Sequence, residues 1–299
     1  MPGERELTQT TLAERIRARL PELTKAERRV AHVLLGRYPL AGLETVQALA
    51  RRAGVSTASV LRFTGKLGFA SYTAFQGELR EQLAATLQSP LTRYREDDGE
   101  PAVGNAGLVR RHLEESRAAL AEAEALVVGS EIEATVGLLA DTRRPVYLLG
   151  GRYSGNVAGY MADLLRGVRP HIVHVDGQTQ KWADHLLDIG RRTVLVCFDF
   201  RRYQPDVLIF AERAAKRGAR IVLITDPWHS AIERVASHVL PVPVASPSIY
   251  DSLAPAVALA EALVGALARR LGDRARSRIE AQEELRQPFR SAPAEPHKP

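Results

Sequence analysis

The second half of the chain alternates short apolar runs with helix-length segments, and this alternation limits the folds open to it more than any other feature. Five runs of four or five residues, rich in Val, Ile and Leu, have the composition of strands buried on both faces. They cover 146–149, 172–175, 194–198, 221–225 and 239–242. Segments of helical length lie at 155–166, 179–189, 206–217, 230–236 and 252–271. Because parallel strands need such crossovers, the pattern predicts a doubly wound, five-stranded parallel sheet with helices on both faces.

The first 88 residues predict a separate, all-α domain, so the expected fold class is a two-domain α plus α/β protein. Thr24 and Glu27 have the spacing of a capping box, and Pro39 closes the helix that they open. Further short helices are predicted at 44–53, 56–68 and 71–89. The predicted organisation is a helical domain, a linker rich in Pro, Gly and charge, an α/β domain and a disordered tail, at 1–88, 89–107, 108–285 and 286–299.

The positive charge of the chain is concentrated in the helical domain. The formal net charge is +6, and residues 1–80 contain 13 Lys and Arg against 7 Asp and Glu, whereas the remainder contains 28 of each kind. A small basic domain beside a neutral large one is typical of a nucleic-acid binder, although a solvated basic face gives the same count.

Residues 44–69 have the pattern of a helix-turn-helix unit. Gly54 supplies the positive φ that a tight turn needs, and Ser56 caps the second helix. Val60 and Phe63 of that helix share the arc that faces the core, whereas the opposite arc is small, polar and basic, with Ala58, Ser59, Arg62, Gly65 and Lys66. Such an arc can enter the major groove of DNA. The alternative interpretation is an ordinary helical hairpin with solvated cations.

Two loops at the carboxyl ends of predicted strands form the expected ligand site, as in other doubly wound sheets. Glycines at 150–151 let the backbone approach an anion, and Arg152 and Ser154 add hydrogen-bond donors at a helix start. Arg201 and Arg202 precede the helix that begins near Pro205 and attract anions to the second loop.

Three alternatives remain open at these loops. The two arginines of the second loop can instead pair with Asp199 and Asp206 as part of the scaffold. Asp176, at the end of the second strand, leaves a nucleotide site open. Ser246, Ser248 and Asp251 either face the same pocket or cap the last long helix, and capping is favoured for Ser248.

Two stretches of the helical domain resemble the RpiR/MurR family of transcription regulators. They are residues 23–35 (LTKAERRVAHVLL) and 46–75 (VQALARRAGVSTASVLRFTGKLGFASYTAF), and the resemblance covers most of 8–88. It implies a dimeric repressor or activator of metabolic genes. The positions that it implies for DNA contact are Ser56, Thr57, Ser59, Arg62 and Lys66.

Residues 126–272 resemble a SIS (sugar isomerase) domain, through GGRYSG at 150–155 and AERAAKRGARIVLITD at 211–226. The resemblance implies a phosphosugar-type effector at the two loops and dimerisation through this domain. The family's usual second loop, Ser-x-Ser-Gly-x-Thr/Ser, is altered here: Asp199 and Arg201 replace the serines, Arg202 the glycine and Gln204 the last hydroxyl. A carboxylate repels phosphate unless the arginines neutralise it. We therefore expect a small anionic effector, a sugar phosphate or another organic anion, at Gly151, Arg152, Ser154, Asp199, Arg201, Arg202 and Gln204.

The sequence as a whole predicts a cytoplasmic, DNA-binding transcription regulator of metabolic genes that forms a homodimer or higher homo-oligomer. Its predicted partners are double-stranded DNA and a small anionic metabolite, with no membrane span, cofactor, metal site or catalytic residue. One cysteine, Cys197, excludes an internal disulfide. The alternative is a sugar-phosphate isomerase with an accessory helical domain, but isomerisation needs a Glu or His base that neither loop supplies. A DNA-organising structural protein is a third class, which the elaborate α/β domain disfavours.

Overall fold

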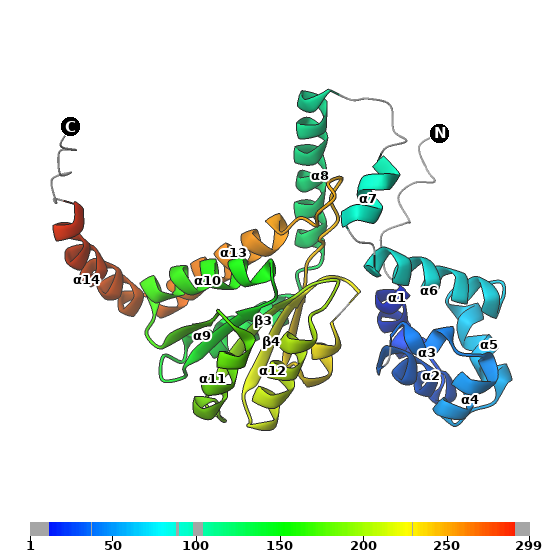
Figure 1. Ribbon diagram of the computed structural model, residues 1–299. Coiled ribbons are helices and arrows are strands. Elements are labelled where there is room, and N and C mark those ends of the chain that lie inside the picture. Colours follow the sequence, from blue (N-terminus) through cyan, green and yellow to red (C-terminus); the bar gives the residue numbers. More distant parts are fainter. Residues whose placement is uncertain (1–11, 37, 88–89, 98–103, 229, 291–299) are drawn as a thin grey trace.

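The computed structural model describes residues 12–36, 38–87, 90–97, 104–228 and 230–290, which form a helical N-terminal domain and an α/β domain (Figure 1). The helical domain consists of α1 (Leu12–Arg19), η1 (Leu20–Glu22), α2 (Lys25–Gly36), α3 (Leu40–Leu43), α4 (Val46–Ala53), α5 (Thr57–Lys66) and α6 (Tyr72–Leu87). Its core gathers around the fully buried rings of Phe63 and Phe75. The capping box is present, because the backbone N–H of Thr24 donates to Glu27 Oε2 at 2.8 Å and that of Glu27 to Thr24 Oγ1 at 3.4 Å.

The region between the two domains is more helical than the sequence predicted. Helix α7 (Pro90–Asp97) lies inside the predicted linker, and α8 (Asn105–Ala125) begins within it. Proline at the first position of α7 is compatible with a helix, because its missing N–H would have no partner there anyway. Helix α9 (Gly129–Ala140) then leads into the sheet.

The sheet has the predicted five strands, all parallel: β1 (Val146–Gly150), β2 (Ile172–Val175), β3 (Val194–Asp199), β4 (Arg220–Thr225) and β5 (His238–Pro241). Their spatial order is β2-β1-β3-β4-β5. The chain therefore reverses its direction of winding between β1 and β3, where Val146 pairs with Val194. This is the topological switch point at which doubly wound sheets bind ligands.

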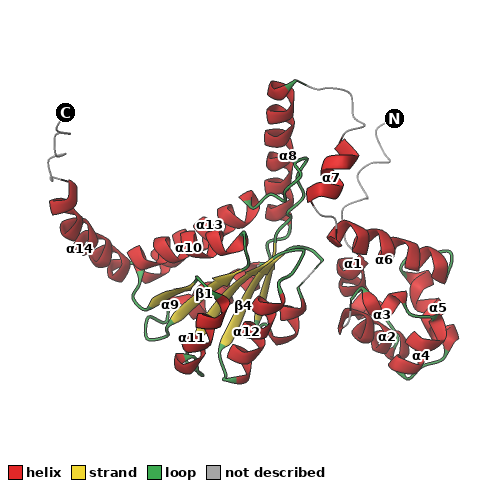
Figure 2. Ribbon diagram, in the orientation of Figure 1, coloured by secondary structure: helices red, strands yellow, loops and turns green. Residues whose placement is uncertain are grey.

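Helices cover both faces of the sheet, as predicted (Figure 2). Val196 and Phe198 point to the face packed by α10 (Ser154–Val168) and α13 (Ala254–Leu271), and α9 packs beside them. Leu195 and Cys197 point to the other face, which is packed by α11 (Trp182–Asp188), α12 (Pro205–Lys216) and η3 (Ala231–Val235), and the short turn η2 (Thr179–Lys181) leads into α11. Because the apolar residues of the three central strands alternate between two apolar layers, their continuous apolar runs are accounted for.

The described chain ends in α14 (Asp273–Arg290), which points away from the sheet (Figure 1). The prediction of a disordered tail is wrong for 286–290, which continue this helix, because residues 280–287 (EAQEELRQ) are good helix formers. The remainder of the predicted tail, 291–299, lies outside the described residues. None of the helices that the structure describes combines the length and the apolar character needed to cross a bilayer.

Candidate functional site

Helices α4 and α5 form the predicted helix-turn-helix. Gly54 ends α4 with a φ of 62° and donates its N–H to the carbonyls of Ala50 and Arg51. The hydroxyl of Ser56 accepts from the backbone N–H of Ser59 at 3.3 Å and so caps α5. The positive φ at Gly54 and the cap at Ser56 are thus confirmed, and together they fix the angle at which α5 leaves the turn.

Of the five predicted DNA-contacting residues, four are exposed: Ser56, Thr57, Arg62 and Lys66. Arg62 is held in place, since its Nη2 donates to Ser59 Oγ at 3.2 Å. Leu61, which the sequence interpretation left unassigned, is also exposed on this surface. Its position one residue before Arg62, outside the core-facing arc, was the available signal. An apolar side chain there can contact a thymine methyl group.

Ser59 differs from the sequence interpretation, which placed it on the outer arc. It is only 6% exposed, and its hydroxyl contacts Ser56 Oγ at 3.0 Å as well as Arg62. The physical reason is its position one turn after the cap, where its side chain folds back against the helix N-terminus. We therefore assign Ser59 to the positioning of Arg62.

Lys66 is exposed but already has a partner. Its Nζ donates to Glu27 Oε2 at 2.8 Å, and that carboxylate is almost fully buried. Burial raises the pKa of Glu27, but hydrogen bonds from Lys66 and Thr24 outweigh burial, and the pKa lies below its usual value. Lys66 therefore joins α5 to α2 in addition to any role at DNA.

All seven predicted effector residues line one cavity of about 440 Å³ at the carboxyl ends of β1 and β3. The sequence interpretation left out or left open its remaining lining residues, Tyr153, Phe200, Tyr250, Asp251 and Leu253. Tyr153 and Tyr250 form an edge-to-face pair with ring centroids 6.0 Å apart. Asp176 is not among the lining residues, which weakens the nucleotide alternative.

Hydrogen bonds from side chains of both loops hold the first loop in place. Ser154 Oγ donates to the carbonyl of Phe198 at 2.7 Å and accepts from the N–H of Gly151 at 2.8 Å, so this buried hydroxyl joins the two loops. The side-chain oxygen of Gln204 accepts from the N–H of Arg152. It packs so closely over Gly151 that any Cβ there would collide with it. Gln204 thus occupies a backbone donor that an anion would use.

Asp199 is buried at the end of β3 and accepts a hydrogen bond from the hydroxyl of Ser230. Burial, together with the negative charges of Asp226 and Asp206, raises its pKa to about 7 against the opposing effect of the hydrogen bond from Ser230. Near neutral pH this carboxyl is therefore partly protonated, which reduces the repulsion that it would exert on an anion.

Asp251 is the acidic partner of the second loop. Arg201 Nε donates to Asp251 Oδ1 at 2.7 Å, and Arg202 Nη2 lies 3.7 Å from Oδ2. The arginines thus pair with Asp251 rather than with Asp199 or Asp206, the partners of the scaffold alternative. Asp251 faces the pocket. Ser248 does not cap α13, because its hydroxyl accepts from Tyr250 N at 3.4 Å.

Helix α7 reaches this same carboxylate. Arg93 Nη2 donates to Asp251 Oδ1 at 2.9 Å, and its Nη1 donates to the carbonyl of Ser248 at 3.2 Å. A second contact between the domains is the bidentate pair of Arg17 with Glu233, at 2.7 Å for both oxygens. The segment that follows the DNA-binding domain is therefore bonded directly to the rim of the cavity.

Arg152 is the cation of the cavity that no carboxylate neutralises within the described residues. Its guanidinium lies 5.2 Å from the ring centroid of Tyr153 and is exposed. It stands beside the first turn of α10, whose N–H groups and dipole favour negative charge. Among the residues that the structure describes, those that line the cavity include neither Glu nor His. Across the described ranges, no three His, Cys, Asp or Glu side chains are grouped to bind a metal ion.

Two family models match the chain. Residues 10–86 match the helix-turn-helix domain of the rpiR family, and residues 138–266 match the SIS domain. The two matches coincide with the two domains of the structure.

Two of the relatives that the chain matches are named as HTH-type transcriptional regulators. The transcriptional regulator HexR of Pseudomonas aeruginosa is 33% identical over 147 residues, which are 49% of this chain and 50% of HexR. The HTH-type transcriptional regulator YfhH of Escherichia coli is 28% identical over 240 residues, 76% of this chain and 79% of YfhH. Among solved structures, the Vibrio vulnificus NanR protein complexed with ManNAc-6P has a TM-score of 0.53 at 19% identity, over 93% of this chain and 99% of that one, and so shares the fold.

Proposed function

We propose that this chain, which belongs to the rpiR family of helix-turn-helix proteins, is a transcription regulator that binds duplex DNA through α5 and a small organic anion in its SIS domain. Its named relatives HexR and YfhH are transcriptional regulators. The observation that carries the DNA-binding proposal is the exposed outer side of the first two turns of α5, where Ser56, Thr57 and Arg62 are exposed to solvent. A helix presented in this way reads the major groove and meets phosphates with its free N–H groups.

The effector that we propose is a sugar phosphate or a similar small anion in the 440 Å³ cavity. Arg152 offers an unneutralised cation, and the partly protonated Asp199 can donate a hydrogen bond to the same ligand. NanR, which shares the fold, is described in complex with ManNAc-6P. We propose binding without turnover, because the described residues that line the cavity supply no Glu or His to act as the base of an isomerase.

The route from effector to DNA in this proposal runs through Asp251. An anion that attracts Arg201 and Arg202 weakens their hold on Asp251 and changes the bonds that this carboxylate makes with Arg93 of α7. Because α7 follows the DNA-binding domain along the chain, the orientation of that domain changes with it. Such coupling requires the anion to bind the two arrangements with different affinities.

The regulator acts as a homodimer in this proposal, since helix-turn-helix proteins read two half-sites with two copies of the reading helix. DNA binding also places the protein with the chromosome, in the cytoplasm of a bacterial cell.

The test is a gel shift of the full-length protein with the DNA upstream of its own coding region, with and without sugar phosphates and inorganic phosphate. We expect a shifted band. The protein concentration at which half of the DNA is shifted should change at least threefold in the presence of an anion that also raises the melting temperature of the protein. No shift with any duplex contradicts the regulator, and turnover of aldose and ketose phosphates in a coupled assay contradicts binding without catalysis.

A further inference from the structure

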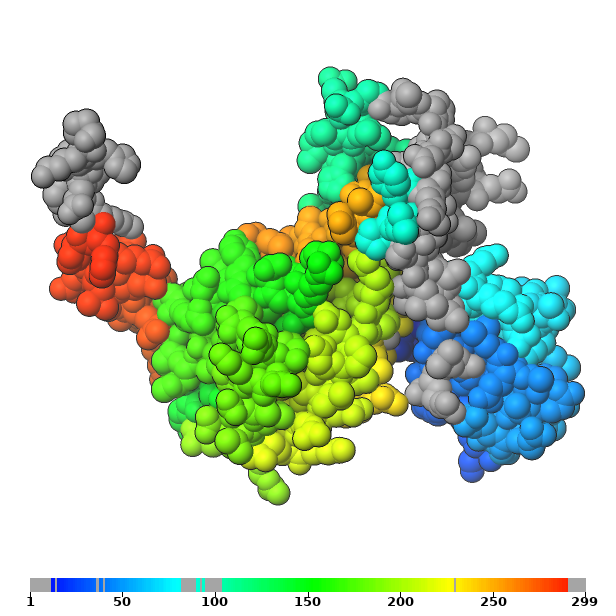
Figure 3. Space-filling view, viewed as in Figure 1, coloured from blue at the N-terminus to red at the C-terminus, as the bar shows by residue number. Residues whose placement is uncertain are grey.

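Helix α8 carries an apolar stripe that the described chain leaves largely uncovered. Its members recur at alternating spacings of four and three: Val109, Leu113, Ser116, Leu120 and Ala123. This is the spacing by which two helices pack side by side. Val109 is 60% exposed, Leu113 63% and Leu120 41%. The helix rises above the α/β domain (Figures 1 and 3), and the side chains of Val109 and Leu113 in its first half are exposed within the part of the chain that the structure describes.

The packing of α8 within its own domain uses a different side of the helix. Ala119 is buried, and His112 Nδ1 lies 3.4 Å from Ser246 Oγ. At 100° per residue, these two positions lie about 60–80° away from the centre of the stripe. Val109 and Leu113 of the stripe are therefore not needed to hold α8 against its own α/β domain.

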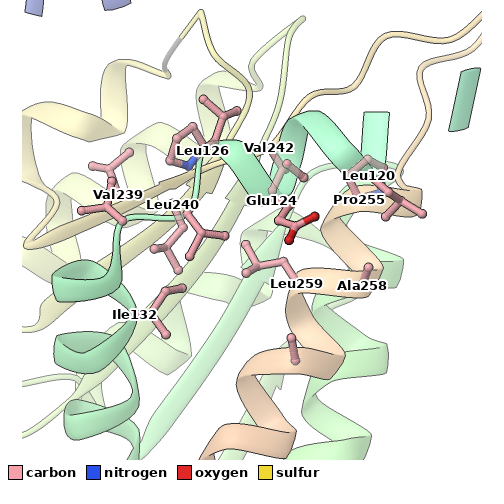
Figure 4. A pocket seen from close by; sticks show the side chains of 15 residues that line it. Leu120, Glu124, Leu126, Ile132, Val239, Leu240, Val242, Pro255, Ala258 and Leu259 are labelled. Atoms are coloured by element: carbon pink, nitrogen blue, oxygen red, sulfur yellow. The ribbon is translucent and has the colours of Figure 1, made fainter. Parts of the chain in front are cut away.

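The stripe continues into an apolar groove of about 270 Å³ between the end of α8, β5 and α13 (Figure 4). Leu120 and Ala123 belong to both the stripe and the groove lining. The other side chains that face this groove are almost all aliphatic, with Leu126, Ile132, Val239, Leu240, Val242, Pro255 and Leu259 among them. Stripe and groove form one continuous apolar surface, the kind of patch that marks an interaction site.

The charges that flank the stripe change sign along the helix. Arg110, Arg117 and Glu124 each follow a stripe residue directly, so all three lie on one flank. In an antiparallel pair of α8 helices, Glu124 of each copy comes beside Arg110 of the other, whereas the two Arg117 side chains lie near each other at the two-fold axis and, being long, can point to solvent. A parallel pair would place no Glu124 beside an Arg110 and would align helix dipoles of the same sense, which is less favourable.

We infer that two copies of this chain associate by packing their α8 helices antiparallel along this stripe. Leu113 of one copy then lies opposite Ala123 of the other, and Leu120 opposite Ser116. Large side chains thus face small ones, and the layers interdigitate. The contact is self-complementary about a two-fold axis, as a closed dimer requires. The inference specifies the homodimer of the proposed function and rests on it.

The first test measures the mass of the full-length protein in solution by light scattering across a dilution series. We expect a dimer for the natural chain and at least a tenfold weaker dimer for Leu113→Glu. The matched control is Leu187→Glu, because Leu187 is 74% exposed on α11, far along the chain from the stripe. Circular dichroism checks that both variants fold. A monomeric natural chain, or a Leu113→Glu protein that dimerises normally, overturns the inference.

The second test fixes the direction of packing by cysteine cross-linking, which the chain permits because its one natural cysteine, Cys197, is buried. A mixture of Leu113→Cys and Ala123→Cys proteins should form a disulfide-linked dimer on oxidation, whereas neither protein alone should. Cross-linking of Leu113→Cys alone would show parallel packing and overturn the inference. If the natural protein is a monomer that still binds DNA and phosphate, the α8 interface is overturned and the proposed function stands. If the protein forms the cross-linked dimer but binds neither DNA nor phosphate, the proposed function is overturned and the α8 interface stands.

Discussion

Replacement of Asp199 by Asn should remove a pH dependence from the stability of the α/β domain. Burial, with the charges of Asp226 and Asp206, raises the pKa of this carboxyl from an ordinary value of 3.8 to about 7. The folded protein therefore binds more protons than the unfolded chain between these two values. Its free energy of unfolding falls as the pH rises through this window and levels off above pH 7.

The size of the effect follows from the difference between the two pKa values. At 1.36 kcal/mol per pH unit, a difference of about three units corresponds to roughly 4 kcal/mol. Between pH 5 and pH 8, about 2 to 3 kcal/mol of this difference is realised, because the unfolded carboxyl is already ionised at pH 5. Asp199 is only 3% exposed, so solvent does not screen the effect away.

The assay is urea unfolding at pH 5 and pH 8, followed by tryptophan fluorescence. Both tryptophans of the chain, Trp182 and Trp228, lie in the α/β domain, so the signal reports this domain rather than the helical one. The natural protein should lose about 2 to 3 kcal/mol more than Asp199→Asn when the pH is raised. Asp163→Asn, at an exposed carboxylate, is the control and should behave like the natural protein. An equal loss in the natural and Asp199→Asn proteins would refute the reasoning.

Three further predictions concern the contacts around the two sites. Lys66→Met should lower the free energy of unfolding of the helical domain by about 1–3 kcal/mol, because it leaves the buried carboxylate of Glu27 without its cation. A thermal melt followed by circular dichroism that does not change would contradict this. Arg93→Ala should bind phosphate with an affinity within twofold of that of the natural protein, yet its DNA affinity in gel shifts should no longer respond to anions. A retained response would exclude α7 as the route from effector to DNA. Gln204→Ala should bind phosphate several-fold more tightly than the natural protein in calorimetry, since it frees the backbone N–H of Arg152. Weaker binding would mean that the Gln204 side chain itself contacts the anion.

The sheet could be predicted from the sequence because strands buried on both faces leave continuous apolar runs, and each observed strand begins and ends within one residue of its run. Helices α3, α7 and α14 were missed for different physical reasons. The four residues of α3 are too few to show a period, α7 lies in a segment rich in Pro and charge, and α14 has almost no apolar face.

The candidate sites were predictable only as far as local rules reach. Strand ends and glycines located the two loops of the cavity, and the cap at Ser56 located the reading helix. The pairing of Arg93 with Asp251 joins residues 158 positions apart, and that of Lys66 with Glu27 joins residues 39 apart. No local pattern contains such information, because tertiary packing alone brings these side chains together.

The central claim, that α5 reads duplex DNA, is tested most directly by fluorescence anisotropy of the full-length protein with a labelled duplex from its own upstream region. The titration is repeated from low to high salt and with Arg62→Ala. The account predicts an affinity that falls steeply as salt rises, because phosphate contacts release counterions, and a loss of about 1–3 kcal/mol on removal of Arg62. Affinity that is absent or indifferent to salt, or an Arg62→Ala protein that binds as tightly as the natural one, would contradict it.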